Sequence, residues 1–307
     1  MRSLRYIDEV PFQYIGKGEQ CIIKTKLALA DKKAQKASVM LMEEPENHLT
    51  HTRLNQLIDD ILERCDGRQI IISTHSSFVA NKLGIDNLIL LSSGGHRAKF
   101  RDLTDETRDF FKRLAGFDTL RLVLSQRTIL VEGASDELVV QRAYMDAHNR
   151  KLPIEEGIDV ISVGTSFLRF LEIADKIQKR VAVITDNDGN IAALEKKYKN
   201  YIGNDLKENI LISFDKNDYT PEPSIKDYNY NTLENVLLHA NNMKTLNALF
   251  GTSYRSEDNL RGYMKDHKTK CALAIFDSKS EIAYPDYIKE AIAHVCEQAD
   301  YSCRRIG

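Results

Sequence analysis

The sequence lacks the features that would place it at once in a membrane, secreted or zinc-binding class. No apolar run approaches the ~20 residues that a membrane-spanning helix needs, and the N-terminus shows no signal-peptide pattern. The 5 cysteines are scattered without a C-x-x-C pair, which is typical of reduced thiols and not of a disulfide framework or a zinc site. The net charge is only −2, so any DNA binding must come from local patches. We therefore expect a cytoplasmic protein with no membrane partner.

The first third of the chain has the pattern of an α/β layer. With 307 residues, 42% hydrophobic and 29% charged, the chain is long enough for two domains with separate cores. Apolar strand-like runs at 38–42 and 69–73 flank a stretch, 54–62, whose apolar residues recur at helical spacing. A third run, 87–91, ends at a turn signal over 92–95. This alternation predicts parallel pairing of the strands.

The pattern then restarts after a charge-rich helical stretch over about 105–124. Strands are predicted at 128–131, 158–163, 181–185 and 210–214, with helices at 135–147 and 167–178 between them, and the chain is mostly helical from about 230. We expect Ser135 to cap the first of these helices. The predicted organisation is one α/β unit over 1–104, a helical linker over 105–126 and a second, parallel-sheet unit over 127–307.

Carboxylates follow two of the predicted strands in the second unit. Glu132 ends the strand 128–131 and Asp136 lies four residues later, while Asp186 and Asp188 follow the strand 181–185. The carboxyl ends of adjacent parallel strands open onto one crevice, so these acids are expected to meet there. Such a cluster would repel itself unless a hard divalent cation with oxygen ligands, Mg²⁺ or Mn²⁺, were bound. Two such ions can activate a water and stabilise the leaving oxygen of a phosphodiester.

Each motif taken alone also has an interpretation without a metal site. An Asp-x-Asp-Gly after a strand is more often a turn than a metal site, and the loop does not fit an EF-hand because the third ligand position and the terminal Glu are wrong. The two motifs together, each at a strand end and about one βαβ unit apart, are much more specific.

The same segments resemble the two signature motifs of the Toprim fold, which topoisomerases, bacterial primases and OLD-family nucleases share. They are VEGASDELVV (131–140) and ITDNDGN (184–190), and ISVGTSFLRFL (161–171) is similar to the segment between them. The resemblance implies that Glu132 binds one metal and takes part in chemistry. It also implies that Asp186 and Asp188 hold metal, with Asp136 as an auxiliary acid.

Two further segments are similar to OLD-family nucleases in particular. NTLENVLLH (231–239) carries Glu234 where those nucleases supply a further acid for the metal, and HKTKCALAIFDS (267–278) carries Lys268 where they have a catalytic lysine. Each segment alone could be ordinary helix surface. A topoisomerase would need a nucleophilic tyrosine in a recognisable context, and a primase would carry a zinc module, so neither alternative fits as well.

The first unit resembles the back half of an ABC-type ATPase. Residues 39–45 are similar to a Walker B strand, in which Glu43 would order Mg²⁺ and Glu44 would polarise the attacking water. Residues 47–49 resemble the following D-loop, and 72–76 the segment of the switch histidine, here His75. Residues 15–20, with Gly16 and Gly18, resemble a divergent signature loop in which Gly16 replaces the usual serine. A Glu-Glu-Pro is otherwise often just a helix start, and a lone histidine is more often structural.

No G-x-x-x-x-G-K-[ST] loop occurs in the sequence, so the triphosphate has no cradle here. The resemblance therefore predicts an α/β protein: a partial ABC-type ATPase unit over 1–104, then a Toprim domain with a Rossmann-like parallel sheet and a helical C-terminal part. We expect either the C-terminal portion of a longer OLD-type protein or a member that has lost its front half, with ATP bound only if missing sequence or a partner supplies the loop.

The expected function is a Mg²⁺- or Mn²⁺-dependent DNA endonuclease, with two metals in its site. By resemblance to OLD-family proteins of anti-phage defence, nucleotide binding would regulate it. A homo-oligomer and a partner defence protein are also implied. The alternative is a non-catalytic regulatory or DNA-scaffold subunit. Retention of the four core carboxylates weighs against that alternative, and the missing loop weighs for it.

Overall fold

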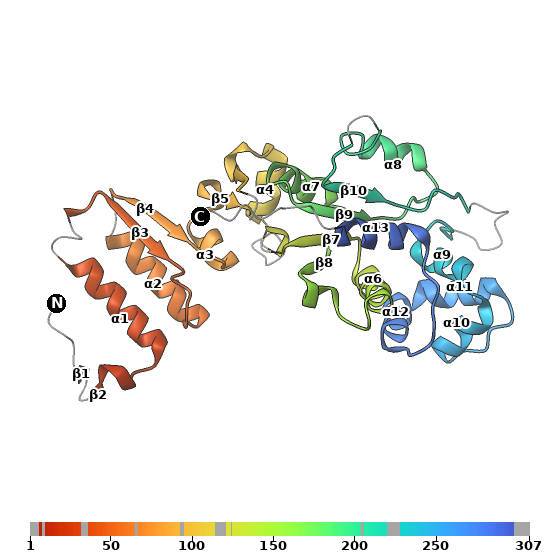
Figure 1. Ribbon diagram of the computed structural model, residues 1–307, viewed down its shortest axis with the longest axis horizontal. Coiled ribbons are helices and arrows are strands. Elements are labelled where there is room, and N and C mark those ends of the chain that lie inside the picture. The colour runs from red at the N-terminus through yellow and green to blue at the C-terminus, as the bar shows by residue number, and fades with distance from the viewer. Residues whose placement is uncertain are drawn as a thin grey trace, which may run out of the picture. The chain divides into compact units, whose positions relative to one another are not determined.

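A computed structural model of the chain describes residues 6–7, 10–31, 36–64, 67–92, 95–113, 121–123, 125–203, 206–219 and 228–297. The contacts between residues divide it into two compact units, one formed by residues up to 88 and the other by 89–113 and 121–307 (Figure 1). The predicted domain bounds stay a prediction, but these contacts place residues 89–104 in the second unit. Among the described residues, no helix is long and apolar enough to cross a membrane.

The first unit contains a small parallel sheet with helices against it. Its elements are β1 (Tyr6–Ile7), β2 (Val10–Pro11), η1 (Phe12–Tyr14), α1 (Lys17–Ala30), β3 (Val39–Glu43), α2 (His51–Arg64), β4 (Gln69–Ser73), α3 (Ser77–Lys82) and η3 (Ile85–Asn87). β3 and β4 pair in parallel, with Met40 opposite Ile70. Leu57, Ile58 and Ile61 of α2 are fully or almost fully buried. The predicted strand, helix and strand are thus present.

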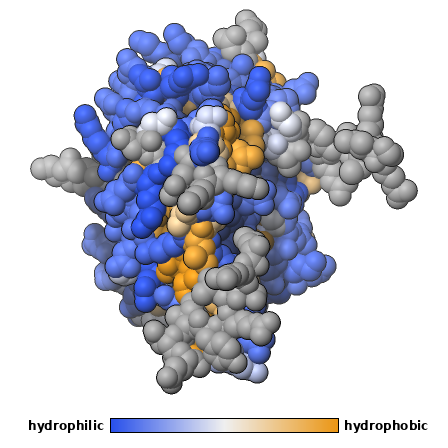
Figure 2. Space-filling model, turned by 90° about the vertical axis from the view of Figure 1, so that its left-hand side faces the viewer, coloured by the Kyte–Doolittle hydropathy of each residue, from blue (hydrophilic) through white to orange (hydrophobic). Residues whose placement is uncertain are grey.

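The two faces of the β3–β4 sheet differ in burial. Met40, Met42, Ile70 and Ile72 pack against the buried residues of α1 and α2. The alternate residues Val39, Leu41 and Ile71 are 46%, 73% and 51% exposed. Figure 2 shows hydrophobic side chains forming a strip among hydrophilic ones on the side of the molecule that it displays. Parallel strands are normally covered on both faces, so these two strands retain an uncovered apolar face.

The second unit is built on a four-stranded parallel sheet, as predicted. Its elements are β5 (Ile89–Leu91), β6 (Arg97–Lys99), η4 (Phe100–Asp102), α4 (Asp105–Arg113), β7 (Arg127–Val131), α6 (Ala134–Ala147), η5 (Pro153–Glu156), β8 (Ile158–Ser162), α7 (Phe167–Lys176), β9 (Arg180–Ile184), α8 (Ile191–Lys197), β10 (Ile210–Ser213), α9 (Leu233–Ala240), α10 (Met243–Phe250), α11 (Glu257–Asp266), α12 (Lys268–Asp277) and α13 (Asp286–Cys296). The strand order is β10-β9-β7-β8, with every pair parallel. The α/β class with a Toprim-like parallel sheet and a helical C-terminal part is confirmed.

Helices cover this sheet. α13 contacts β7, β9 and β10, α6 contacts β7 and β8, α7 contacts β9 and β10, and α12 lies against α6 (Figure 1). This double cover explains why the strands are continuous apolar runs, with Ile129, Leu130 and Val131 fully buried.

Two details differ from the sequence predictions. The run 87–91 does not join a parallel layer, because β5 pairs antiparallel with β6. Ser135 is not the cap of α6: Gly133 occupies the N-cap position, and the Asp136 carboxylate accepts a hydrogen bond from the Gly133 N–H at 2.9 Å. Of the predicted boundary helix, α4 covers 105–113, whereas 114–120 lies outside the described residues.

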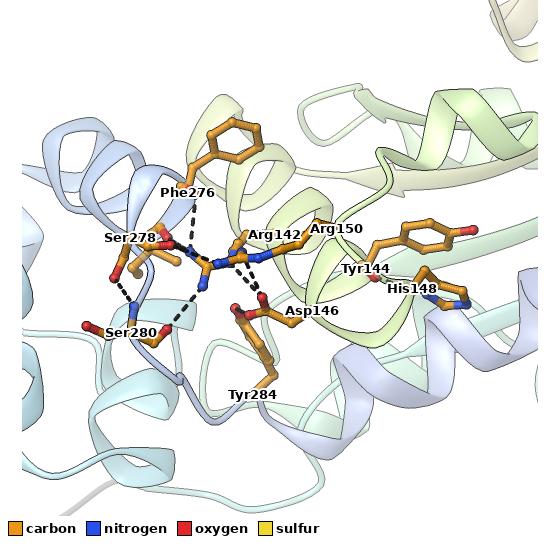
Figure 3. Close-up of polar contacts among 10 residues, drawn as sticks. Arg142, Tyr144, Asp146, His148, Arg150, Phe276, Ser278, Ser280 and Tyr284 are labelled. Atoms are coloured by element: carbon orange, nitrogen blue, oxygen red, sulfur yellow. Dashed lines mark hydrogen bonds and ion pairs between the residues drawn. The ribbon is translucent and has the colours of Figure 1, made fainter.

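A buried arginine joins α6 to the C-terminal end of α12. Arg142 is 1% exposed. Its guanidinium donates to the Ile275 carbonyl at 2.6 Å, to the Phe276, Ser278 and Ser280 carbonyls beyond it, and to Asp146 at 2.9 Å (Figure 3). The last carbonyls of a helix have no partner within the helix and carry negative partial charge, so a cation there satisfies both needs. Asp136 lies in the first turn of α6, and Lys268 is the first residue of α12. The contacts of Arg142 therefore join two helices whose first turns carry predicted site residues.

Candidate metal centre

Two neighbouring strands deliver the first acids of the site. β7 and β9 are paired with Leu130 opposite Val183, so Glu132 after β7 and Asp186 after β9 emerge at the same edge of the sheet. The Asp186 backbone N–H donates to Glu132 Oε1 at 3.3 Å. The Thr185 hydroxyl donates to the same oxygen at 2.5 Å. The structure thus brings together the two motifs that the sequence placed at strand ends.

Burial and neighbouring acids raise the pKa values of two carboxyls at this edge, Asp186 and Asp136. The pKa of Asp186 is raised to about 9, first by burial and then by the charges of Asp136, Glu132, Glu234 and Asp188. Burial is also the main reason why the pKa of Asp136 is raised to about 6; the Gly133 N–H opposes this, and Glu132 and Glu234 add to it. Four predicted metal ligands therefore lie close enough to Asp186 for their charges to oppose its ionisation.

Asp188 lies in the turn after β9, which a buried asparagine holds. The Asn187 side chain is 3% exposed and donates to the backbone carbonyls of Asp215 and Asn217 at 2.6 and 2.9 Å. Asp188 adopts a left-handed backbone conformation with φ of 50° and accepts a hydrogen bond from Asn229 at 2.7 Å. These contacts fix the turn, and Asp188 within it is exposed.

Glu234 and Lys268 meet although 33 residues separate them along the chain. Glu234 on α9 is 8% exposed, and its Oε1 lies 2.9 Å from the ammonium nitrogen of Lys268, the first residue of α12. Burial lowers the pKa of Lys268. Its hydrogen bond and ion pair with Glu234, and the charges of Asp186 and Asp136, outweigh that effect, so the pKa is raised overall. Lys268 therefore stays cationic beside the acids.

The chemistry of this donor set fits a hard divalent cation, because every candidate ligand is a carboxylate oxygen. In the described part of the chain, however, no three acidic, imidazole or thiolate groups converge closely enough to hold an ion as they stand. Four of the five acids already have a protein partner: Glu132 with Thr185, Asp136 with Gly133, Asp188 with Asn229 and Glu234 with Lys268. Metal binding would have to rearrange some of these contacts.

The first unit brings its Walker B-like and switch-like segments together. Glu44 follows β3 with a φ of 43°, and its carboxylate lies 3.3 Å from His75 Nε2 and accepts a hydrogen bond from Asn47 at 2.7 Å. Glu46 accepts from the Thr74 hydroxyl at 2.7 Å and from the His75 N–H at 2.9 Å. A pocket of about 290 Å³ is lined by Glu44, Glu46, Asn47, Leu49, His51, Leu54, His75 and Ser76.

The predicted signature-like loop is the start of α1. Gly16 is its N-cap residue, and Gly18 lies in its first turn against the loop after β3. A Cβ atom at Gly18 would lie 2.4 Å from the His48 carbonyl oxygen, whereas one at Gly16 would meet nothing within 4 Å. Glu43 is the exposed last residue of β3, opposite Ser73. Gly18 is thus required by close packing, and no described contact requires glycine at Gly16.

Sequence reasoning missed two residues that contact acids of the metal centre and one that contacts the switch-like segment of the first unit. Thr185 and Asn229 donate to Glu132 and Asp188, and Glu46 receives two hydrogen bonds from the switch-like segment. Thr185 and Glu46 lie directly beside recognised motif residues, so their positions in the sequence could have identified them as candidate site residues. Asn229 precedes the Glu234 segment, and nothing local indicates its contact.

Comparisons with known proteins agree with this organisation. Residues 123–188 match a family model described as the Toprim domain of "overcoming lysogenization defect protein-like" proteins. Residues 8–81 match an AAA domain model whose description names the AbiEii toxin of type IV toxin–antitoxin systems. No curated protein matches the chain.

Two similar solved structures are of the C-terminal region of the OLD protein of Xanthomonas campestris pv. campestris, one phased with platinum and one with mercury. Both are 20% identical to this chain. The match to the first has a TM-score of 0.40 and covers 57% of this chain and 94% of that chain. The match to the second has a TM-score of 0.38 and covers 56% of this chain and 94% of that chain.

Proposed function

We propose a metal-dependent nuclease function for this chain, which joins a segment of an AAA-type ATPase domain to an OLD-like Toprim domain, as OLD-family proteins do. The proposed substrate is DNA, and the proposed metal is Mg²⁺ or Mn²⁺. The observation that carries the proposal is the acidic edge of the sheet. There Asp186 has a pKa of about 9 because burial and four other acids oppose its ionisation. A divalent cation would reverse that opposition, and it would supply what metal-assisted cleavage of a phosphodiester uses.

The residues have distinct roles in the proposed reaction. Glu132, Asp136, Asp186, Asp188 and Glu234 would hold the metal. The metal would supply an activated water and positive charge at the phosphodiester, and two ions would allow both the attacking and the leaving oxygen to be contacted. Oε2 of Glu132 has no hydrogen-bond partner among the described residues, so it is the oxygen that would accept the proton of the attacking water. Lys268 adds a compact positive charge for the non-bridging oxygens of the phosphate.

Lys268 has a second consequence for the site. Its ion pair with Glu234 places a cation among the acids before any metal binds. Glu234 could serve as a metal ligand only by giving up this ion pair, and the Lys268 ammonium would then be available to a phosphate of DNA. The same contact therefore links metal binding to phosphate binding.

Plasmid cleavage tests the nuclease proposal. Purified chain is incubated with supercoiled plasmid while Mg²⁺ or Mn²⁺ is titrated, and nicked and linear products are followed. Asp186→Ala should lower the rate by several orders of magnitude, since metal and electrostatic contributions are each worth several kcal/mol. Cleavage by Asp186→Ala at the rate of the parent, across the metal titration, would show that the assignment of the site is wrong.

We further propose that the first unit makes the nuclease respond to nucleotide. The contact of Glu44 with His75 supports this, because it joins a carboxylate suited to polarise water to a side chain suited to touch a γ-phosphate. The chain alone should not hydrolyse ATP, because its sequence contains no G-x-x-x-x-G-K-[ST] loop. ATP turnover by the purified chain that Glu44→Gln abolishes would contradict this.

The resemblance to OLD-type proteins of anti-phage defence supports a defence role in the cytoplasm, with a homo-oligomeric assembly and a defence partner. One observation favours a second candidate, a non-catalytic regulatory or DNA-scaffold subunit. Four of the five acids of the site already have a protein partner, as acids of a purely structural cluster would. Calorimetry separates the two: the nuclease must bind Mn²⁺ at this site, and the scaffold need not.

A further inference from the structure

Thr185 joins β9 to Asp186 and contacts Glu132. Its side chain is buried, with the residue 5% exposed. The Thr185 Oγ1 lies 2.5 Å from Glu132 Oε1 and 3.3 Å from the Asp186 carbonyl oxygen. A hydroxyl has one proton to donate, and the shorter contact to a charged acceptor is the stronger one. The Thr185 hydroxyl therefore donates to Glu132.

The sheet makes Thr185 a rigid donor. Its backbone N–H donates to the Ser213 carbonyl at 3.3 Å, which extends the pairing of β9 with β10 by one residue. Its branched Cβ restricts rotation about χ1. The hydroxyl is therefore placed by the strand, and it does not depend on a flexible loop.

Two donors meet on one oxygen of Glu132. Oε1 accepts from Thr185 and from the Asp186 N–H, whereas Oε2 has no hydrogen-bond partner among the described residues. A free carboxylate rotates about its terminal torsion and can present either oxygen. Here the two donors remove that freedom, so the oxygens have different environments. Partners behind a metal ligand orient it and tune its affinity.

We propose that Thr185 is the positioning residue of Glu132: it holds Oε1 and so leaves Oε2 for the metal and the attacking water. This rests on the proposed nuclease function for its chemistry, but the contact itself does not. The Thr185 methyl group restricts rotation but makes no hydrogen bond, so serine should largely replace threonine and valine should not.

The test uses Thr185→Val, which keeps the shape of the side chain and removes the donor. Thr185→Ser restores the hydroxyl. Thr128→Val is the matched control, because Thr128 in β7 is also buried. Its hydroxyl lies 2.7 Å from the Ser125 hydroxyl, and Ser125 is not a residue of the site. Each protein is assayed for Mn²⁺ affinity by calorimetry and for plasmid cleavage at saturating Mn²⁺.

Thr185→Val should lose about 10- to 100-fold in Mn²⁺ affinity or cleavage rate, the usual effect of removing such a partner. Thr185→Ser should recover most of the loss, and Thr128→Val should behave like the parent in both assays even if its melting temperature falls. Thr185→Ala takes the place of Thr185→Val if the latter does not fold.

The outcomes separate this proposal from the nuclease function. A parent that cleaves, with Thr185→Val matching it in both assays, overturns the role of Thr185 alone. A parent that binds Mn²⁺ without cleaving DNA, and loses that affinity on Thr185→Val only, supports the role of Thr185 while removing the nuclease function. An equal loss in Thr128→Val and Thr185→Val means that the effect is structural and overturns the proposal.

Discussion

Metal binding at the acidic edge should release protons, and the number released should depend on pH. In the metal-free protein the pKa of Asp186 is raised to about 9 and that of Asp136 to about 6, in each case chiefly by burial. A carboxylate must lose its proton to bind a metal ion, so metal affinity and pH are linked.

The expected magnitude follows from these values. Between pH 6 and 9 Asp186 holds its proton until metal binds, so the apparent binding constant should rise about tenfold per pH unit, or ~1.4 kcal/mol. At pH 7.5 metal binding should release about one proton from Asp186 and almost none from Asp136. Below about pH 6 Asp136 is protonated as well, and the slope should steepen towards two protons per metal-bound site.

The same pKa values predict how the metal-free protein responds to pH. Asp186 is ionised above about pH 4 in the unfolded chain but stays protonated to about pH 9 when folded, so the folded state binds more protons in that window. Its contribution to stability therefore falls as pH rises from about 4 to 9. Asp186→Asn should remove this loss, and its melting temperature should exceed that of the parent most at the alkaline end.

The assay is calorimetric titration of Mn²⁺ at several pH values, repeated in buffers of different ionisation enthalpy so that proton release is counted directly. Asp186→Asn should bind Mn²⁺ weakly and release no proton at pH 7.5. Glu195→Gln, an exposed change on α8, serves as the control for replacing a carboxyl by an amide away from the site. Binding by the parent with no proton release and no pH dependence between 6 and 9 would refute the reasoning.

Three further predictions concern packing and the roles of lysines. Gly18→Ala should destabilise the protein by about 1–3 kcal/mol, because its Cβ would meet the loop after β3. Gly16→Ala meets no clash and should cost less, under about 1 kcal/mol for an alanine at a helix N-cap; chemical denaturation compares the two. Arg142→Met should cost about 1–3 kcal/mol in the same assay, since it leaves buried helix-end carbonyls without their donor while Asp146 keeps its ion pair with Arg150. A loss under about 0.5 kcal/mol would show that the contacts of Arg142 are dispensable. Lys268→Ala should bind DNA nearly as the parent does but cleave it poorly at saturating DNA. Lys270→Ala should instead weaken DNA binding and lower the salt dependence of that binding. The opposite pattern would mean that Lys268 is not the catalytic lysine.

The strands of the second unit could be predicted closely because both of their faces are buried. A strand covered on both sides is a continuous apolar run, so β7, β8, β9 and β10 stand out from their surroundings. The run at 87–91 was misjudged because its partner, Arg97–Lys99, is a short charged strand without an apolar pattern. Local sequence therefore revealed buried elements better than it revealed an exposed hairpin.

The acids of the site could be identified from their places after strands, but their partners could not. Glu132 and Asp186 follow apolar runs, and parallel pairing then brings them to one edge. The contact of Asn229 with Asp188 joins segments 41 residues apart, and only the folded chain shows it. Asp136 illustrates a further limit, since its sequence position suits both a metal ligand and a helix-capping residue, and the structure shows the capping contact.

The nuclease proposal depends most directly on Glu132. The measurement is cleavage of supercoiled plasmid in Mn²⁺ by the parent, by Glu132→Gln and by the exposed control Glu195→Gln, with melting temperatures confirming that all three are folded. The account predicts cleavage by the parent and by Glu195→Gln, and a rate lower by several orders of magnitude for Glu132→Gln. Cleavage by Glu132→Gln at the parent's rate would contradict it.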